Sequence, residues 1–177
     1  MPKASQVLLA VEYDREPVPV RDLGHLVRAD ADQASDIYLF VKDYKSPKDL
    51  LAQIATPSEW DPDSLRDDIN DRRQAWYVLQ SQERQKLGVA VIKTSNSPET
   101  VAVNVLLDSS VPDLMLATHR VLVTLTQHAI TRSNARSVLV LVKDQELATL
   151  LLRQSTRSCR FIKWQVRSDI TILKHPQ

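Results

Sequence analysis

The chain has 177 residues, of which 43% are apolar and 25% are charged. This length and composition fit one globular domain with a sizeable core, and we expect a single domain over residues 1–177. Lys and Arg total 23 against 22 acidic residues, so the net charge predicts neither a nucleic-acid nor a membrane partner. No apolar run is long enough to span a bilayer, and Met1–Ser5 shows no signal-peptide pattern. The single cysteine, Cys159, excludes an internal disulfide and a cysteine-based metal site.

The N-terminal part of the chain predicts a strand followed by a helix. Gln6–Val11 is a short apolar run of the length of a strand, and charged residues and two prolines follow it. Asp22 is a suitable N-cap for a helix that would contain Leu23 and Leu26, although Gly24 weakens this prediction.

Residues 37–74 predict one short apolar segment and two helices. Ile37–Val41 is ambiguous between strand and helix, and its β-branched and aromatic residues favour a strand by propensity. A helix is expected from Pro47 through Ile54, with proline at its first position. A second helix begins at Asp61–Asp63 and turns Leu65 and Ile69 inward.

From residue 75 the pattern is sharper. We expect three antiparallel strands, a long amphipathic helix, a strand buried on both faces, a further helix and a closing hairpin. The corresponding segments are residues 76–80, 87–93, 100–107, a helix of about twenty residues from Pro112, residues 137–142, residues 144–154, and residues 161–166 with 169–173.

This order of elements resembles the GCN5-related N-acetyltransferase (GNAT) fold, over residues 75–177 better than over residues 1–74. Residues 144–153 resemble the family's Asn-x-x-Ala-x-x-Leu-Tyr helix, and Cys159–Phe161 lies where the family often has Gly-Phe. The resemblance implies an α/β (α+β) domain with a mixed, largely antiparallel sheet flanked by helices. The strand that ends at Leu107 and the strand that starts near Ser137 should be parallel neighbours that splay apart.

The family holds acetyl-CoA with an Arg/Gln-x-x-Gly-x-Gly/Ala loop at the start of the long helix. Residues 108–115 read DSSVPDLM and contain no glycine; the whole chain has only two. Pro112 has no N–H to offer a phosphate, and Asp113 adds a negative charge there. We therefore expect no tight acetyl-CoA binding and no cofactor. If the chain is an enzyme after all, the resemblance assigns the cofactor contacts to Leu107, Ser109, Ser110, Asp113 and Leu114.

The residues for proton transfer also depart from the family. Its general-acid tyrosine on the later helix corresponds to Leu151 or Leu152, and the strand before the loop offers Asn104 where a glutamate base would stand. Tyr77 is interpreted as a half-buried structural residue. No catalytic residue is assigned, so the hypothesis is a non-catalytic or strongly diverged protein, and the alternative is an acetyl-CoA-dependent N-acyltransferase with an unusual loop.

The histidines do not predict a metal site. His119 and His128 are nine positions apart, which is not the i, i+4 spacing of helical metal ligands. The aspartates of residues 61–71 lack the spacing and the glycine of a calcium loop, and a solvated helix face explains them better.

The last quarter of the chain is basic, and it suits a protein contact or self-association. Trp164 stands in the expected closing hairpin among Arg160, Lys163 and Arg167, and Trp and Arg are enriched at interface hot spots. Surface charge that pairs within the molecule, an inward-facing Trp164 and a nucleic-acid contact remain alternatives. GNAT-like proteins also occur in genomes of tailed phages. We thus expect a soluble binding or assembly module that is cytoplasmic or intravirion and not secreted.

Overall fold

The structure is a computed structural model, and it describes the backbone of residues 15–42, 61–70, 74–94, 99–132, 135–153, 161–167 and 170–174. In residues 163–167 and 170–174 the side chains are outside this description. The expected strand Gln6–Val11 and the expected helix Pro47–Ile54 lie outside the described residues, as do residues 154–160.

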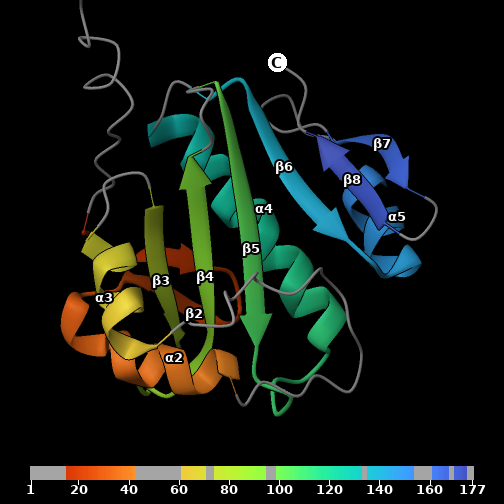
Figure 1. The fold of residues 1–177 in the computed structure, drawn as a ribbon. Helices are drawn as coiled ribbons and strands as arrows, with labels where there is room; N and C mark the ends of the chain where they lie inside the picture. Colours follow the sequence, from red (N-terminus) through yellow and green to blue (C-terminus); the bar gives the residue numbers. More distant parts are fainter. Residues whose placement is uncertain are drawn as a thin grey trace, which may run out of the picture.

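The described strands form one eight-stranded mixed sheet in the order β1-β2-β3-β4-β5-β6-β8-β7 (Figure 1). All neighbouring pairs are antiparallel except β5 and β6, which are parallel. This confirms the expected fold class, and the expected strands from residue 76 onward agree with the structure to within two residues. The strands are β1 (Val18–Val20), β2 (Gly24–Arg28), β3 (Gln74–Gln80), β4 (Lys86–Thr94), β5 (Thr100–Leu107), β6 (Ser137–Val142), β7 (Ile162–Arg167) and β8 (Ile170–Lys174).

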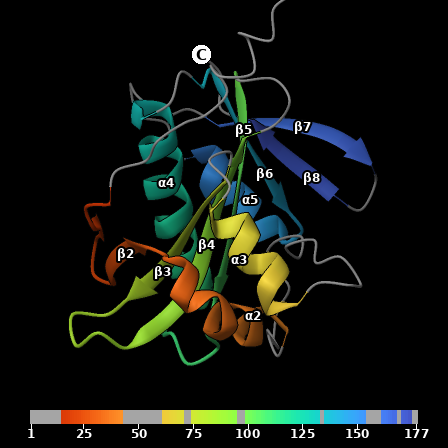
Figure 2. The ribbon, with the colours of Figure 1, turned by 60° about the vertical axis from the view of Figure 1, so that its left-hand side comes forward.

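Helices cover both faces of the sheet. Figure 2 shows α2 and α3 on one side of strands β2–β5 and α4 on the other. None of the helices within the described residues is long and apolar enough to cross a membrane. The helices are η1 (Ala31–Gln33, a short 3-10 helix), α2 (Ala34–Lys42), α3 (Pro62–Asn70), α4 (Leu114–Arg132) and α5 (Gln145–Arg153).

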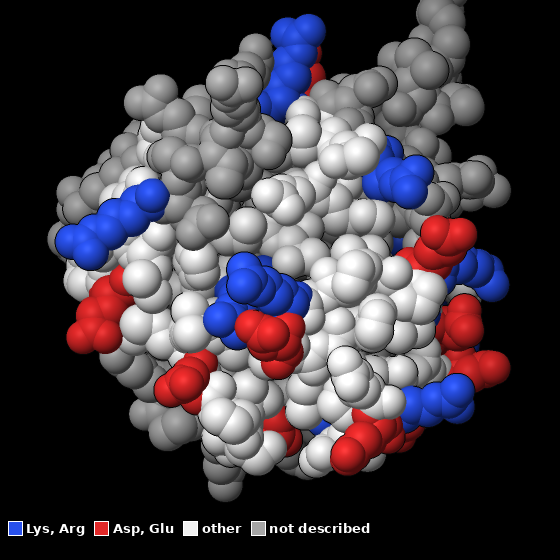
Figure 3. Space-filling view, turned by 180° about the vertical axis from the view of Figure 1, so that it is seen from behind, with Lys and Arg blue, Asp and Glu red and all other residues white. Residues whose placement is uncertain are grey.

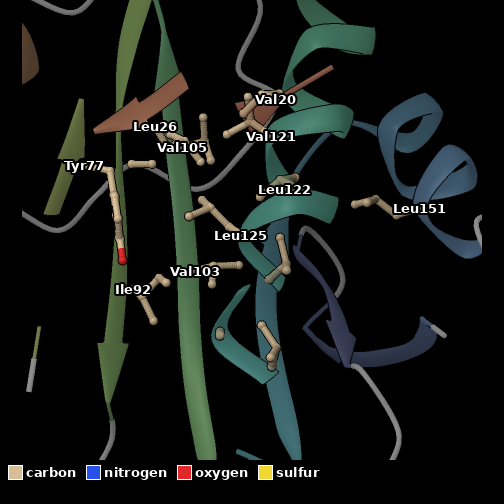
Figure 4. Close-up of a cluster of buried hydrophobic side chains, with 14 of the residues drawn as sticks. Val20, Leu26, Tyr77, Ile92, Val103, Val105, Val121, Leu122, Leu125 and Leu151 are labelled. Carbon is tan, nitrogen blue, oxygen red and sulfur yellow. The ribbon is translucent and has the colours of Figure 1, made fainter. Parts of the chain in front are cut away.

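The larger core lies between the sheet and α4. Figure 4 shows Val103 and Val105 of β5 directed at Leu125 of α4, while Leu151 reaches α4 from α5. Leu125 and Leu151 are fully buried, and burial of one such side chain stabilises the fold by about 1.5–3 kcal/mol. Because α4 contacts both the sheet and α5, its position is fixed along its length.

A second core lies beneath α2 and α3 and includes the fully buried Trp76. The Trp76 indole Nε1 donates to Asp68 Oδ2 at 2.7 Å, and the Gln74 amide donates to the other oxygen of the same carboxylate. Asp61 caps α3 as expected, since its Oδ1 accepts a hydrogen bond from the Ser64 N–H at 2.8 Å. These bonds attach α3 to β3.

The predicted helix after Asp22 is wrong, because β1 and β2 form a hairpin there. Gly24 has a φ of +144°, which no helix residue adopts, and a Cβ at this position would lie 1.9 Å from the Gln80 carbonyl oxygen. Leu26 is buried while His25 is exposed, which is the alternation of a strand with one covered face. The close approach of β3 explains why glycine stands here.

For the ambiguous segment Ile37–Val41 the preference for a strand is also wrong, because these residues belong to α2. The Asp30 N–H donates to Gln33 Oε1 at 3.0 Å, so the segment starts with a capped turn. Ala34 and Ile37 are buried, and Tyr38 and Val41 pack against the same core. Their i, i+3, i+4, i+7 spacing is helical, and it prevails over β propensity.

Two details of the second half differ from expectation. The long helix begins at Leu114 rather than Pro112, because Asp113 has a φ of +49°, outside the right-handed helical region. Strand β6 is buried on one face only: Leu141 is 41% exposed, whereas Val138 and Val140 are fully buried. Helix α5 and α4 cover one side of β6, and no described helix packs on the other.

Strands β5 and β6 are parallel neighbours that separate along their length, as predicted. Their register pairs are Thr100 with Ser137, Val101 with Val138 and Ala102 with Leu139. The later residues of β5 have no partner on β6 within the described chain, and Figure 1 shows the two strands diverging on either side of α4. The loop from β5 to α4 lies at the wide end of this separation.

Candidate cofactor loop and neighbouring pocket

The loop between β5 and α4 is attached to the sheet at its first residue, where the Asp108 N–H donates to the Leu87 carbonyl at 2.7 Å. The five positions that the resemblance assigns to a cofactor differ in exposure. Leu107 is buried in the core and Leu114 is half-buried, whereas Ser109, Ser110 and Asp113 are exposed. The last three present their side chains to solvent, and Leu114 does so in part.

The carboxylate and the carbonyl of Asp108 close the loop on itself. The Ser110 N–H donates to Asp108 Oδ1 at 2.9 Å, and the Val111 N–H donates to the Asp108 carbonyl at 3.0 Å. The hydrogen bond from the Ser110 N–H, and then that from its hydroxyl, lower the pKa of Asp108 below its ordinary value. The loop therefore carries a charged carboxylate at neutral pH.

Asp113 places a second carboxylate at the start of α4. Its carbonyl accepts the hydrogen bond from the Ala117 N–H at 2.9 Å, while its own φ of +49° is left-handed. Its side chain is exposed. A negative charge at a helix N-terminus is favourable for the helix but repels a further anion at the same place.

This loop does not fit the diphosphate of coenzyme A. Such a group needs several N–H donors directed outward at a helix N-terminus. Here the N–H groups of Ser110 and Val111 bond to Asp108, and Pro112 has none. Two carboxylates stand beside the helix start, and residues 106–118 contain no Lys or Arg. No step is therefore assigned to acetyl-CoA.

The positions of proton transfer are occupied by packing residues. Leu151 is fully buried and Leu152 is half-buried. The Asn104 Oδ1 accepts a hydrogen bond from the next backbone N–H, that of Val105, at 2.7 Å. Tyr77 is fully buried, more deeply than expected, and its ring centroid lies 5.7 Å from the Arg28 guanidinium.

The two histidines of α4 face different neighbours. The ring of His128 meets Tyr77 edge to face, with centroids 6.0 Å apart. His119 is 9% exposed, and neither of its ring nitrogens has a hydrogen-bond partner in the part of the chain that the structure describes. Burial, and then the Arg120 charge, lower the pKa of His119. Among the described residues no three His, Cys, Asp or Glu side chains gather as metal ligands would.

The predicted partner surface is only partly described. Arg160 lies outside the described residues, and Lys163, Trp164 and Arg167 are described as backbone positions of β7 without their side chains. Strand β7 pairs with β8 at the end of the sheet order, which agrees with the predicted closing hairpin. The assignment of a partner to these residues stays a prediction.

A pocket between α4 and α5 is a feature that the sequence analysis missed. Its volume is about 350 Å³, and its lining consists of Met115, Gln145, Glu146, Thr149, Leu150 and Arg153. No local pattern predicts it, because it exists only where the first turn of α4 meets α5. A larger hollow of about 830 Å³ lies beside β2, next to His25 and the β3–β4 turn.

Charges of both signs are mixed on the face seen in Figure 3, which is opposite to the view of Figure 1. An ion pair between opposite charges joins Arg120 Nη1 of α4 to Asp22 Oδ2 at 3.4 Å. The described part of this face has no extended basic field of the kind that binds a nucleic-acid backbone.

The chain's sequence matches no protein-family model and no curated protein. Its fold is similar to solved GNAT acetyltransferases. The ribosomal L7/L12 alpha-N-protein acetyltransferase RimL, in complex with coenzyme A, has a TM-score of 0.61 and 15% identity over 90% of this chain and 96% of that one. For a GNAT-family acetyltransferase from Streptococcus pneumoniae the TM-score is 0.60 and the sequence identity is 10%, over 86% of this chain and 98% of that one. For a probable GNAT-family acetyltransferase from Chromobacterium violaceum the TM-score is 0.58 and the sequence identity is 14%, over 94% of this chain and 92% of that one.

These likenesses cover most of the chain and establish a GNAT-like fold with an acetyltransferase-like scaffold. At such low identity they concern the fold alone. The resemblance inferred from the order of elements is confirmed.

Proposed function

We propose that this chain is a non-catalytic or strongly diverged GNAT-like protein that acts as a binding or assembly module. The observation that carries the proposal is the closure of the loop by Asp108, which engages the N–H groups of Ser110 and Val111. A loop that bonds to itself and carries two carboxylates is a poor receptor for a diphosphate. The absence of a donor side chain at Leu151 and Leu152 agrees with this.

Acetyl-CoA titrated by calorimetry against the purified protein tests the proposal. We expect no binding in the micromolar range, since a Kd near 1 µM needs about −8 kcal/mol, which is hard to reach without phosphate contacts. The double variant Asp108→Ala/Asp113→Gly removes both charges and releases the Ser110 N–H, so it should bind acetyl-CoA more tightly than the natural chain. A micromolar Kd for the natural chain that is lost on Ser110→Glu would overturn the proposal.

The alternative is an acetyl-CoA-dependent N-acyltransferase with an unusual loop. The splayed β5 and β6 favour it, because the acetyltransferase-like scaffold is retained. Release of free thiol from acetyl-CoA in the presence of amine acceptors distinguishes the two functions. Turnover that depends on the protein supports the enzyme, and its absence together with the lack of binding supports the module.

The partner of the module is proposed to be a protein or a second copy of the chain, in a cytoplasmic or intravirion setting. Light scattering on the isolated chain and on Trp164→Ala and Arg167→Glu variants tests the contribution of the closing hairpin. A change of oligomeric state in variants that keep the thermal stability of the natural chain would support a contact there. A monomer in every case, with no captured partner, would leave the hairpin without a binding role.

A further inference from the structure

The pocket between α4 and α5 has an apolar floor. Met115 lies in the first turn of α4 and Leu150 in α5, and both are half-buried. A floor of this kind holds an apolar group.

The rim of the pocket is polar and has a charge of each sign. Glu146 and Arg153 are exposed residues of α5, seven positions apart and therefore on the same side of the helix. Two helical turns place them about 10.5 Å apart along the axis. Thr149 lies between them, and its hydroxyl donates to the Gln145 carbonyl at 2.9 Å. The rim therefore runs from an anionic end to a cationic end over the apolar floor.

The size of the pocket limits what it can take. Its volume of about 350 Å³ is near the lower end for ligand sites, which run from about 300 to 1,000 Å³. One large aliphatic side chain with its flanking backbone fits such a space. In an extended segment, the residues before and after this side chain are about 6.8 Å apart. Their long side chains can span the remaining distance to the two charges of α5.

We propose that the pocket between α4 and α5 binds an extended segment of a protein partner that inserts one aliphatic side chain against Met115 and Leu150. A cationic residue of the segment lies toward Glu146, and an acidic residue lies toward Arg153. The inference rests on the proposed function, because it gives the binding module its site and the kind of segment it recognises.

Amide chemical shifts of the ¹⁵N-labelled chain, titrated with capped tripeptides, test the inference. The probe is acetyl-Lys-Leu-Glu-amide, and the matched controls are acetyl-Lys-Ser-Glu-amide and acetyl-Lys-Leu-Lys-amide. We expect shifts confined to the first turn of α4 and to α5, with binding weakened at least about threefold by either control, the size that one apolar anchor or one exposed ion pair supports. The variant Arg153→Glu should weaken the binding of acetyl-Lys-Leu-Glu-amide by a similar factor and strengthen the binding of acetyl-Lys-Leu-Lys-amide.

The control variant is Arg21→Glu, which makes the same charge change at a side chain that is 89% exposed on the β1–β2 turn. It should leave the affinity unchanged. Equal affinity of the three peptides, shifts elsewhere than α4 and α5, or no shifts at all would overturn the inference.

Acetyl-CoA is titrated in parallel to separate this inference from the proposed function. Micromolar acetyl-CoA binding with shifts at residues 108–116 contradicts both proposals. No binding of acetyl-CoA or of the peptides contradicts only the peptide site and leaves the non-catalytic module in place.

Discussion

Two turns of this molecule each carry an aspartate with left-handed backbone, and their surroundings differ. Asp22, in the β1–β2 turn, has a φ of +62°, and its carboxylate lies 3.4 Å from Arg120 of α4. Asp113, before α4, has a φ of +49°, and no ion pair with a described residue accompanies it. The first aspartate contributes to how the hairpin docks on α4. The second keeps a left-handed backbone and an exposed carboxylate at the start of α4, without such a contact to a described residue.

The largest change in stability is expected from a substitution at Gly24, beside the β1–β2 turn. Gly24→Ala would place a Cβ 1.9 Å from the Gln80 carbonyl oxygen, at a φ of +144°. We expect the free energy of unfolding to fall by about 3 kcal/mol or more, because both the contact and the backbone are incompatible with alanine. Denaturant unfolding measures this change, and Gly88→Ala is a second test of close packing, between β4 and β5. A loss below about 1 kcal/mol for Gly24→Ala would contradict the hairpin as described.

A smaller effect is expected at Asp108. Asp108→Ala removes the acceptor of the Ser110 N–H, and loss of an exposed hydrogen bond of this kind costs about 0.5–1.5 kcal/mol. Asp108→Asn keeps an acceptor oxygen without the charge, so it should retain most of the stability. Thermal unfolding of the two variants side by side measures the difference. Equal stability of both variants and the natural chain would mean that the loop does not depend on this bond.

A still smaller difference in unfolding free energy is expected between glycine variants of the two left-handed aspartates, Asp22 and Asp113. Asp113→Gly relieves about 1–2 kcal/mol of left-handed strain but loses a favourable charge at the start of α4 worth about 0.3–1 kcal/mol, so it should raise the unfolding free energy by about 0.5 kcal/mol. Asp22→Gly relieves similar strain but loses the contact with Arg120, a partly exposed ion pair of modest value, so its net change should lie near zero. Chemical denaturation at low and high salt tests the contrast. If Asp22→Gly is more stable than Asp113→Gly at low salt, the expected contrast is wrong.

The smallest effect concerns pH and α4. Burial lowers the pKa of His119 in the folded chain, so on acidification the unfolded chain takes up this proton first. The contribution of His119 is constant above its unfolded pKa of about 6.5, and stability is lost as the pH falls from there through the lower folded pKa. His119→Phe should remove this part of the pH dependence, and the exposed His25→Gln should not. Unfolding curves between about pH 5 and pH 7.5 cover this range, and an unchanged pH profile in His119→Phe would contradict the assignment.

The sequence predicted the second half of the fold well because its signals are local. Alternation and turn residues delimit β3, β4 and β5, and the apolar period of α4 extends over five turns. The first half was predicted less well. Gly24 is explained only by the closeness of β3, which the sequence does not show. At Ile37–Val41 β propensity was given more weight than the helical spacing and the Asp30–Gln33 cap, which are local signals of α2. The interpretation of the missing glycines, Pro112 and Asp113 as features of a changed cofactor loop stays a prediction, which the acetyl-CoA titration tests.

The candidate site could be predicted only in part. Asp108-Ser109-Ser110 carries the local signal of an aspartate that bonds two residues ahead, and this signal was overlooked. The pocket could not be found in the same way, because Met115 and Leu150 come together only through the crossover that brings α5 beside α4. The burial of His119 likewise depends on neighbours that are distant in sequence.

The short pairing of β5 with β6 has a consequence for the dynamics of the molecule. Among the described residues, three residue pairs between β5 and β6 join strands β1–β5 to strands β6–β8, so few backbone hydrogen bonds of the described chain resist opening there. We expect amide hydrogens of β6 and β8 to exchange with solvent water through a partial opening, at a lower free energy than those of β3 and β4. Helix α4 packs against strands on both sides of the β5–β6 pairing, and we expect it to stay with strands β1–β5 when the pairing opens. The molecule would then consist of two cooperative units, and a ligand held between α4 and α5 would protect the smaller one.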